Sequence, residues 1–211
     1  MPTLVVPEVL QIGESLNMSG FADAIGLDVS WPVEVNQNDE MSVTGLVRWA
    51  RAYLNAGELL HFAERHHEPE FYPGPVMQTI GLATELTLKT MLRGGGKSPK
   101  AVRTYSHNTY KAYYDARSYF DEVKFINLHF SNTSHLSVPE EVRIRLTSRG
   151  ETDIEHRWRV YFDHLRVLDT VYDRPYRTRY VTPGSVVLPE TEVILVGTKL
   201  LLTAMEERLA D

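Results

Sequence analysis

Residues 76–96 read VMQTIGLATELTLKTMLRGGG, and this stretch decides the fold that the sequence predicts. At 100° per residue its polar side chains fall within about 80° of one another, on one narrow stripe, while most other positions are apolar, Thr or Ala. The members of this stripe are Gln78, Glu85, Lys89 and Arg93. We therefore expect a helix that is buried on most sides and ends at the glycines. Glu85 and Lys89 are four residues apart in the favourable order and are predicted to pair.

Three further segments are predicted to be long helices, namely residues 43–67, 153–172 and 189–209. The first carries one apolar stripe and ends at a proline-rich segment, and the second carries the most regular apolar stripe of the chain. We expect the helices over residues 43–67, 76–93 and 153–172 to pack on one another, because each stripe needs a partner that buries it.

The shorter segments are less regular. Ser106 is predicted to be the N-cap of a helix that runs to about residue 120. Pro139 occupies a typical first position of a short helix that ends before Gly150. Residues 125–130 alternate poorly and are predicted to be strand-like or a buried loop.

The length and composition predict a single domain, and the helical periods described above place it in the all-α class. With 211 residues, 43% apolar and 24% charged, the chain can bury its own core. Residues 1–42 show no helical period, yet they are too apolar for a disordered tail. We interpret them as an irregular N-terminal arm that packs on the domain or on a partner. Residues 43–211 are predicted to form the helical domain.

Several classes of protein are excluded by the composition. The chain has no cysteine, which excludes disulfides, thiolate metal sites and a cysteine nucleophile, and which fits a reducing cytoplasm. No export signal and no membrane-spanning stretch is recognisable, so a cytoplasmic protein without membrane contact is expected. The formal charge of −6 argues against a broad nucleic-acid binder, so any RNA site must be local.

Three features together resemble the HEPN family of all-helical proteins: the Glu-Leu-x-Leu-Lys sequence at residues 85–89, the glycine loop, and the helix start at Ser106-His107-Asn108. The segment YRTRY at residues 176–180 resembles the Arg-Tyr segment that these proteins often carry before their last helix. Ser106 stands where Gly is commoner in the family, and Asn108 stands where Asp is commoner. The resemblance covers about residues 43–209 and implies a HEPN-like helical bundle. It gives structural roles to Glu85, Lys89, Arg179 and Tyr180.

The resemblance also implies a function. HEPN-like proteins bind or act on RNA or a nucleotide, usually as homodimers, and some are metal-independent endoribonucleases of toxin–antitoxin or anti-phage systems. It thus implies no cofactor, and an antitoxin-type protein as a partner. The alternative is a non-catalytic dimeric HEPN-like module, whose aromatic faces and N-terminal arm serve dimerisation or docking.

HEPN ribonucleases, as the resemblance implies, use an Arg-x4-6-His motif. Three pairs fit this spacing: Arg149 with His156, Arg157 with His164, and Arg159 with His164. Arg149 and His156 are best placed, because they can meet across Gly150 at a helix start that favours a phosphate. In one continuous helix Arg159 and His164 diverge by about 140°, and Arg157 lies about 10.5 Å from His164 along the axis.

Arg103 and His107 are the alternative catalytic pair, one residue short of the motif. His107 lies at a predicted helix start, where a capping or core role competes with catalysis. The remaining binding candidates are basic, and they are Arg143, Arg145, Arg159, Lys97 and Lys100. The arginines form either a salt-bridged solvated helix pair or an anion-binding face. The lysines, beside the glycine loop, belong either to a flexible cap or to a phosphate cradle.

A metal site is the remaining chemical alternative. Glu58 with His61, and Glu64 with His67, each resemble half of a helical di-iron site. The two pairs are six residues apart and point about 120° away from each other on one helix. We therefore interpret them as a solvated polar face and expect no metal.

Overall fold

The computed structural model describes residues 41–66, 73–173, 177–179 and 186–210, and every regular element within these residues is helical. The predicted all-α class is therefore confirmed. Residues 1–40, which make up nearly all of the predicted arm, lie outside the described residues, as do His67 and Tyr180. None of the described helices is both long and apolar enough to cross a membrane.

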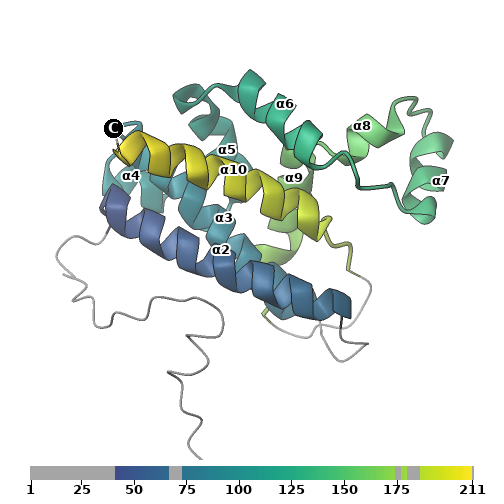
Figure 1. The fold of residues 1–211 in the computed structure, drawn as a ribbon, viewed down its shortest axis with the longest axis horizontal. Coiled ribbons are helices and arrows are strands. Elements are labelled where there is room, and N and C mark those ends of the chain that lie inside the picture. Colours follow the sequence, from purple (N-terminus) through teal and green to yellow (C-terminus); the bar gives the residue numbers. More distant parts are fainter. Residues whose placement is uncertain (1–40, 67–72, 174–176, 180–185, 211) are drawn as a thin grey trace, which may run out of the picture. The chain divides into compact units, whose positions relative to one another are not determined.

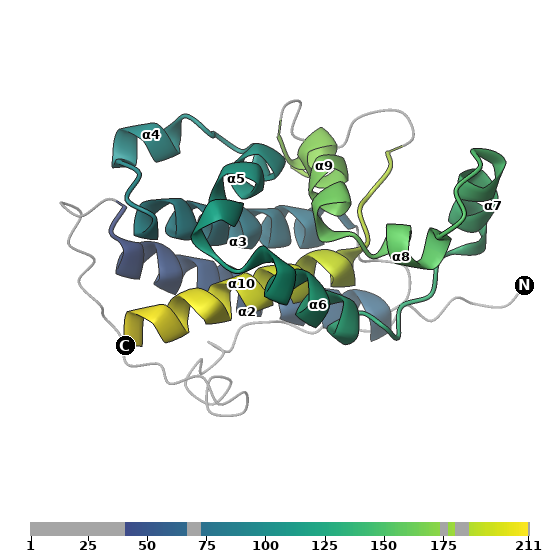
Figure 2. The same ribbon diagram turned by 90° about the horizontal axis from the view of Figure 1, so that it is seen from above.

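Helix α3 (Pro73–Gly94) is the centre of the fold. Helices α2 (Val43–His66) and α10 (Thr191–Ala210) pack on one side of it, and α5 (Thr109–Ala116) and α9 (Tyr161–Tyr172) pack on the other (Figures 1 and 2). The predicted packing is confirmed for α3, which contacts both α2 and α9.

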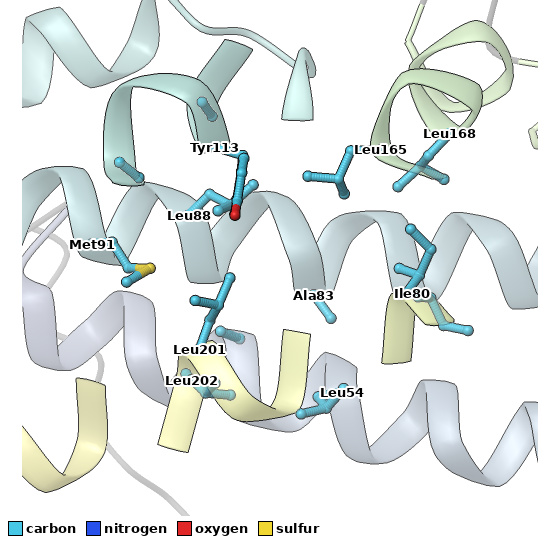
Figure 3. Packing of buried hydrophobic residues seen from close by; sticks show 14 of the residues in the cluster. Leu54, Ile80, Ala83, Leu88, Met91, Tyr113, Leu165, Leu168, Leu201 and Leu202 are labelled. Atoms are coloured by element: carbon cyan, nitrogen blue, oxygen red, sulfur yellow. The ribbon is translucent and has the colours of Figure 1, made fainter. Parts of the chain in front are cut away.

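The core forms around α3 because side chains on most of its circumference are apolar and buried, as the sequence predicts. Figure 3 shows Ile80, Ala83, Leu88 and Met91 between leucines of α2, α9 and α10. At the end of α3 the amide of Lys97 bonds to the carbonyl of Leu92 at 3.0 Å, and Gly96 has a φ of +91°. A left-handed residue is what such a helix end requires, so the glycines terminate α3 as predicted.

The start of α5 differs from the prediction. Its N-cap is Asn108, whose side-chain oxygen accepts a hydrogen bond from the amide of Lys111 at 2.7 Å. Ser106 lies in the preceding turn with a φ of +51°, so it cannot be the cap. The α-helix ends at Ala116, before the predicted end near residue 120, and a 3-10 helix, η2 (Arg117–Tyr119), follows it. Between α3 and α5 lies α4 (Pro99–Arg103), a short helix that was not predicted from the sequence.

The prediction of a strand or loop over residues 125–130 is wrong. These residues belong to α6 (Glu122–Asn132), which is capped by Asp121. Phe125 and His129 are four residues apart, and both rings pack against Tyr161. This pair carries the helical period, but one of its members is a polar residue type, which hides the apolar pattern.

The prediction of one continuous helix over residues 153–172 is also wrong. The chain forms α8 (Ile154–Trp158) and α9, separated at Arg159 and Val160, and Val160 is extended. The side chain of His164 bonds to the carbonyl of Trp158. This carbonyl is therefore satisfied by a side chain and not by the next helical turn. The short helix after Pro139 is α7 (Glu140–Ser148), with Pro139 itself at the N-cap.

Candidate functional site

The carboxylate of Glu85, on α3, accepts hydrogen bonds from three side chains of different elements. Lys89 donates to Oε1 from the next turn of α3. His107, in the loop between α4 and α5, bonds to Oε2 through Nδ1 at 2.9 Å, and the hydroxyl of Tyr172 on α9 donates to the same oxygen at 2.6 Å. The Glu85 side chain is only 7% exposed, so the three donors compensate for a carboxylate that has lost most of its water.

The bond to Glu85 orients the ring of His107. A carboxylate only accepts hydrogen bonds, so the imidazole proton facing Glu85 lies on Nδ1, and in the neutral ring Nε2 is the acceptor nitrogen. The ring also stands edge-on to that of Tyr172, with 5.6 Å between the ring centroids. The His107 side chain is 28% exposed. A partly exposed imidazole whose tautomer is set by a buried carboxylate has the arrangement of a general base.

Gly81 allows Tyr172 to reach Glu85. A Cβ atom on Gly81 would lie 2.5 Å from Cδ2 of the Tyr172 ring, which is too close, so the ring lies directly on the backbone of α3. Tyr172 is fully buried, and burial together with the charge of Glu85 raises the pKa of its hydroxyl. The hydroxyl therefore keeps its proton and donates a hydrogen bond to the carboxylate.

A second group of polar side chains continues along α3. Oε1 of Gln78 accepts a hydrogen bond from Thr178 at 2.8 Å and one from Nε of Arg179 at 3.1 Å. The Arg179 guanidinium also lowers the pKa of the Tyr172 hydroxyl, against the stronger effects of burial and Glu85, which links this group to Glu85. We call the connected residues the α3 polar cluster, and its members are Gln78, Glu85, Lys89, His107, Tyr172, Thr178 and Arg179.

Asp169, one turn before Tyr172 on α9, holds the start of α5. Its Oδ1 accepts bonds from the amide and the hydroxyl of Thr109, both at 2.7 Å, and its Oδ2 accepts from the amide of Tyr110 at 3.0 Å. Burial raises the pKa of Asp169, and the hydrogen bonds from Thr109 and Tyr110 oppose this shift. Because His107 comes two residues before Thr109, the same contact fixes the loop that carries His107.

The pair Arg149 and His156 lies elsewhere, in the part of the chain that contains α7 and α8. Arg149 is the exposed C-cap of α7, and His156 is an exposed residue of α8. The ring of His156 stacks on Phe130 of α6 with 4.2 Å between centroids. Within the described residues no hydrogen bond joins His156 to Arg149, and neither residue contacts the α3 polar cluster.

The neighbouring arginines are largely engaged with acidic side chains. Arg143 pairs with Glu155 and Arg157 with Asp163, while Nε of Arg159 donates to the carbonyl of Glu155. Arg145 is exposed. The salt-bridged alternative thus describes Arg143 and Arg157 better than an anion-binding face does.

His164 is a core residue, which removes the basis for pairing it with Arg157 or Arg159 as a catalytic motif. Its Nδ1 accepts a hydrogen bond from the amide of Glu190 at 3.0 Å, so Nε2 carries the proton and donates to the carbonyl of Trp158. Burial lowers the pKa of His164, which favours this neutral form. Both ring nitrogens are therefore used to join α8, α9 and the segment that leads into α10.

The basic loop after α3 has its own internal contacts. Lys97 lies 5.8 Å from the ring centroid of Tyr105 and 3.9 Å from Oδ2 of Asp115. Lys100 and Arg103 are exposed residues of α4. The residues considered for a metal site lie on α2. Glu58 pairs with Lys199, and His61 lies 3.5 Å from Glu64. Among the described residues, no three histidine or acidic side chains are grouped so that they could hold a metal ion.

Comparisons of the chain with protein-family models, with curated proteins and with solved structures find no match. The fold and the site define an all-helical protein with a carboxylate–imidazole pair, a tyrosine, a lysine and an arginine joined along its central helix. Glu85, Lys89, His107 and Arg179 are candidates from the sequence alone, whereas Tyr172 and Asp169 are not. Tyr172 lies on the apolar stripe of residues 153–172, where sequence alone predicts a core residue, and the binding of Asp169 to a distant helix start leaves no local signal.

Proposed function

We propose that the protein is a HEPN-like RNA-interacting protein and that it cleaves RNA without a metal at the α3 polar cluster. The observation that carries this proposal is the hydrogen bond between Glu85 Oε2 and His107 Nδ1, at 2.9 Å. It supports His107 over His156 as the general base, because a base must be held in one tautomer and one orientation. His156, by contrast, is held by ring stacking, which does not select a tautomer.

In the proposed reaction, Nε2 of His107 takes the proton of a ribose 2′-hydroxyl. The 2′ oxygen then forms a bond to phosphorus while the bond from phosphorus to the 5′ oxygen breaks, and the 5′ oxygen takes up a proton from water. The product is a 2′,3′-cyclic phosphate and a 5′-hydroxyl end. Lys89 and Arg179 supply the positive charge that stabilises the negative charge of the transition state.

The proposal includes a homodimer in a bacterial cytoplasm, with a role in a toxin–antitoxin or anti-phage system and an antitoxin-type protein as the partner. Support for the location comes from the lack of cysteine, which fits a reducing compartment. A variant of the proposal is that the cluster binds a nucleotide and cleaves nothing, since binding needs the same cationic groups.

The test is incubation of the purified full-length chain with structured and unstructured RNAs in the presence of a chelator, followed by analysis of the new ends. We expect cyclic phosphate or 3′-phosphate ends. His107→Ala should abolish cleavage, and Glu85→Gln should reduce kcat, because the amide can present either oxygen or nitrogen to the imidazole and no longer favours one tautomer. Circular dichroism confirms that each variant is folded. Cleavage that is lost in His156→Ala but kept in His107→Ala would contradict the assignment.

The second candidate is a non-catalytic dimeric HEPN-like module, and one observation favours it. Large apolar side chains on α2 are exposed, with Trp49 at 50% and Leu59 at 56%, and Trp49 stacks on Tyr53 along the helix. Apolar residues of this size in solvent are typical of an interaction face. Light scattering separates the candidates: a dimer that Trp49→Glu dissociates, in a protein that cuts no RNA, would favour the module.

A further inference from the structure

The segment from the end of α3 to η2 carries a strong excess of positive charge. Residues 94–119 contain five Lys and Arg residues and a single acidic residue, Asp115. Oδ2 of Asp115 lies 3.9 Å from Nζ of Lys97, so this carboxylate offsets one of the five cations. The other four occupy exposed positions of α4, α5 and η2, and they are Lys100, Arg103, Lys111 and Arg117. A positive surface thus lies on a chain whose formal charge is −6.

The ring of Tyr105 joins the two halves of this surface. Nζ of Lys97, before α4, lies 5.8 Å from the ring centroid, and Nζ of Lys111, on α5, lies 5.7 Å from it. Further along, the guanidinium of Arg117 lies 4.1 Å from the ring centroid of Tyr114, which is 53% exposed. Figure 2 shows α4 and α5 on the same side of α3. We call this surface the α4–α5 basic face, and its members are Lys97, Lys100, Lys111, Tyr114 and Arg117.

The opposite charge is concentrated in residues 1–40, which we call the acidic segment. It contains seven of the 28 acidic residues of the chain and none of the 22 Lys and Arg residues. Residues 41–211 therefore carry 21 acidic and 22 basic side chains, so the net negative charge of the chain comes from the acidic segment. Between its carboxylates stand large apolar residues, among them Val5, Phe21, Ile25 and Trp31. This composition complements a surface that offers cations and an exposed aromatic ring.

The residue that follows the acidic segment is held beside the basic face. Nε of Arg93 donates to the carbonyl of Met41 at 3.0 Å, and Nη1 of the same guanidinium donates to the carbonyl of Lys97. One side chain thus joins the attachment point of the segment to the first residue of the face. Ten extended residues span roughly 33 Å, which is about the length of the 22-residue helix α3. The acidic segment is therefore long enough to reach every cation of the face.

We propose that the acidic segment docks on the α4–α5 basic face of the same chain. Its carboxylates pair with Lys100, Lys111 and Arg117, and one of its apolar side chains covers the ring of Tyr114. Attachment to the domain favours this occupant over a free partner, because tethering raises the local concentration to the order of millimolar. Pairs between exposed charges are weak one by one and are screened by salt, so high ionic strength should release the segment. The proposal uses no residue of the α3 polar cluster and is independent of RNA cleavage.

Cross-linking of the full-length chain with a carbodiimide tests the proposal, because this reagent joins a carboxylate directly to a lysine that it contacts. The acidic segment contains no lysine, so each link from one of its carboxylates identifies the surface that it touches. We expect at least about fivefold more links to the lysines of the basic face than to the exposed Lys124 and Lys199. The pair of Lys199 with Glu58, at 2.9 Å, is the internal positive control. Salt at about 0.5 M should remove the links from the segment.

Arg117→Glu is the variant, because it reverses one charge of the basic face and leaves all of its lysines in place. It should lower the yield of links from the acidic segment to the face about fivefold. Arg145→Glu makes the same change at an exposed position of α7 and should leave the yield within about twofold of the wild type. An equal mixture of 15N-labelled and unlabelled chains separates one chain from two, since links within a chain join peptides of one isotope only.

The proposal is wrong if the acidic segment links to Lys124 or Lys199 as often as to the basic face. It is also wrong if the segment links to no lysine while Lys199 links to Glu58, or if Arg117→Glu leaves the yield unchanged. Links between labelled and unlabelled peptides would assign the face to a second copy and overturn the assignment to one chain. If added RNA or an acidic protein protects the lysines of the face and the segment does not, the face belongs to an external partner and the proposal is refuted.

Discussion

At the scale of single residues, Gly81 sets how closely α9 approaches α3. Its missing side chain lets the ring of Tyr172 lie on the helix backbone, and this position brings the hydroxyl to 2.6 Å from Glu85. An alanine would favour the helix by about 1 kcal/mol. The clash with the buried ring outweighs this gain, because the ring is held at its far end by Glu85 and has no room to move.

We therefore expect Gly81→Ala to lower the free energy of unfolding by a net amount of about 1–3 kcal/mol, as overpacking of a core usually does. Urea denaturation measures the change. The control is a double-mutant cycle with Tyr172→Leu, in which the smaller side chain should relieve most of the cost of Gly81→Ala. If alanine at position 81 stabilises the protein, the close contact between Tyr172 and α3 does not exist.

At the scale of helices, the ends of the short elements depend on side chains from other parts of the chain. The first amides of α5 bond to Asp169 of α9, and the last carbonyl of α8 bonds to His164 of α9. Helices this short are marginal by themselves, so contacts of this kind decide whether they form.

We expect Asp169→Asn to destabilise the start of α5. The amide can accept a hydrogen bond through only one of its two atoms, so one donor at the start of α5 loses its partner at a cost of about 1–3 kcal/mol. We expect faster amide hydrogen exchange in α5 and in the loop around His107 than in α10. Asp173→Asn, at the C-cap that follows α9, is the comparison variant. Uniform exchange across all helices would show that Asp169 does not anchor α5 locally.

At the scale of the whole molecule, two buried histidines link the helices around the start of α10. His164 accepts from the amide of Glu190, and Nε2 of His129 donates to the carbonyl of Val193 at 3.0 Å. Burial lowers the pKa of both from the usual 6.5. The unfolded chain therefore binds protons first as the pH falls below about 6.5, and the folded state loses stability there.

Between pH 7.5 and 5.5 each histidine should lower the free energy of unfolding by up to about 1.4 kcal/mol. Urea denaturation at several pH values measures this, and the loss should be absent above about pH 7.5. Asparagine at position 164 keeps an acceptor for the amide of Glu190 but does not titrate. In His164→Asn the free energy of unfolding should therefore change less between pH 7.5 and 5.5, by the contribution of His164. A stability that is constant down to pH 5.5 would contradict the neutral, buried assignment of both residues.

Much of the fold and part of the site follow from the sequence alone. The bounds of α2 and the end of α3 are predictable because an apolar period and the glycines act within a few residues. The Glu85–Lys89 pair is predictable for the same reason, since residues four apart lie on one face of a helix. Long segments with a helical apolar period also predict the all-α class.

Only the tertiary structure decides which distant residues complete these local patterns. The other two donors to Glu85 lie 22 and 87 residues away, and Asp169 binds an amide 60 residues from it. The break between α8 and α9 depends likewise on His164, a polar residue that becomes a core residue through two backbone partners. Such contacts arise from how helices pack, and packing depends on the shape of all the buried faces together and not on the spacing within any one of them.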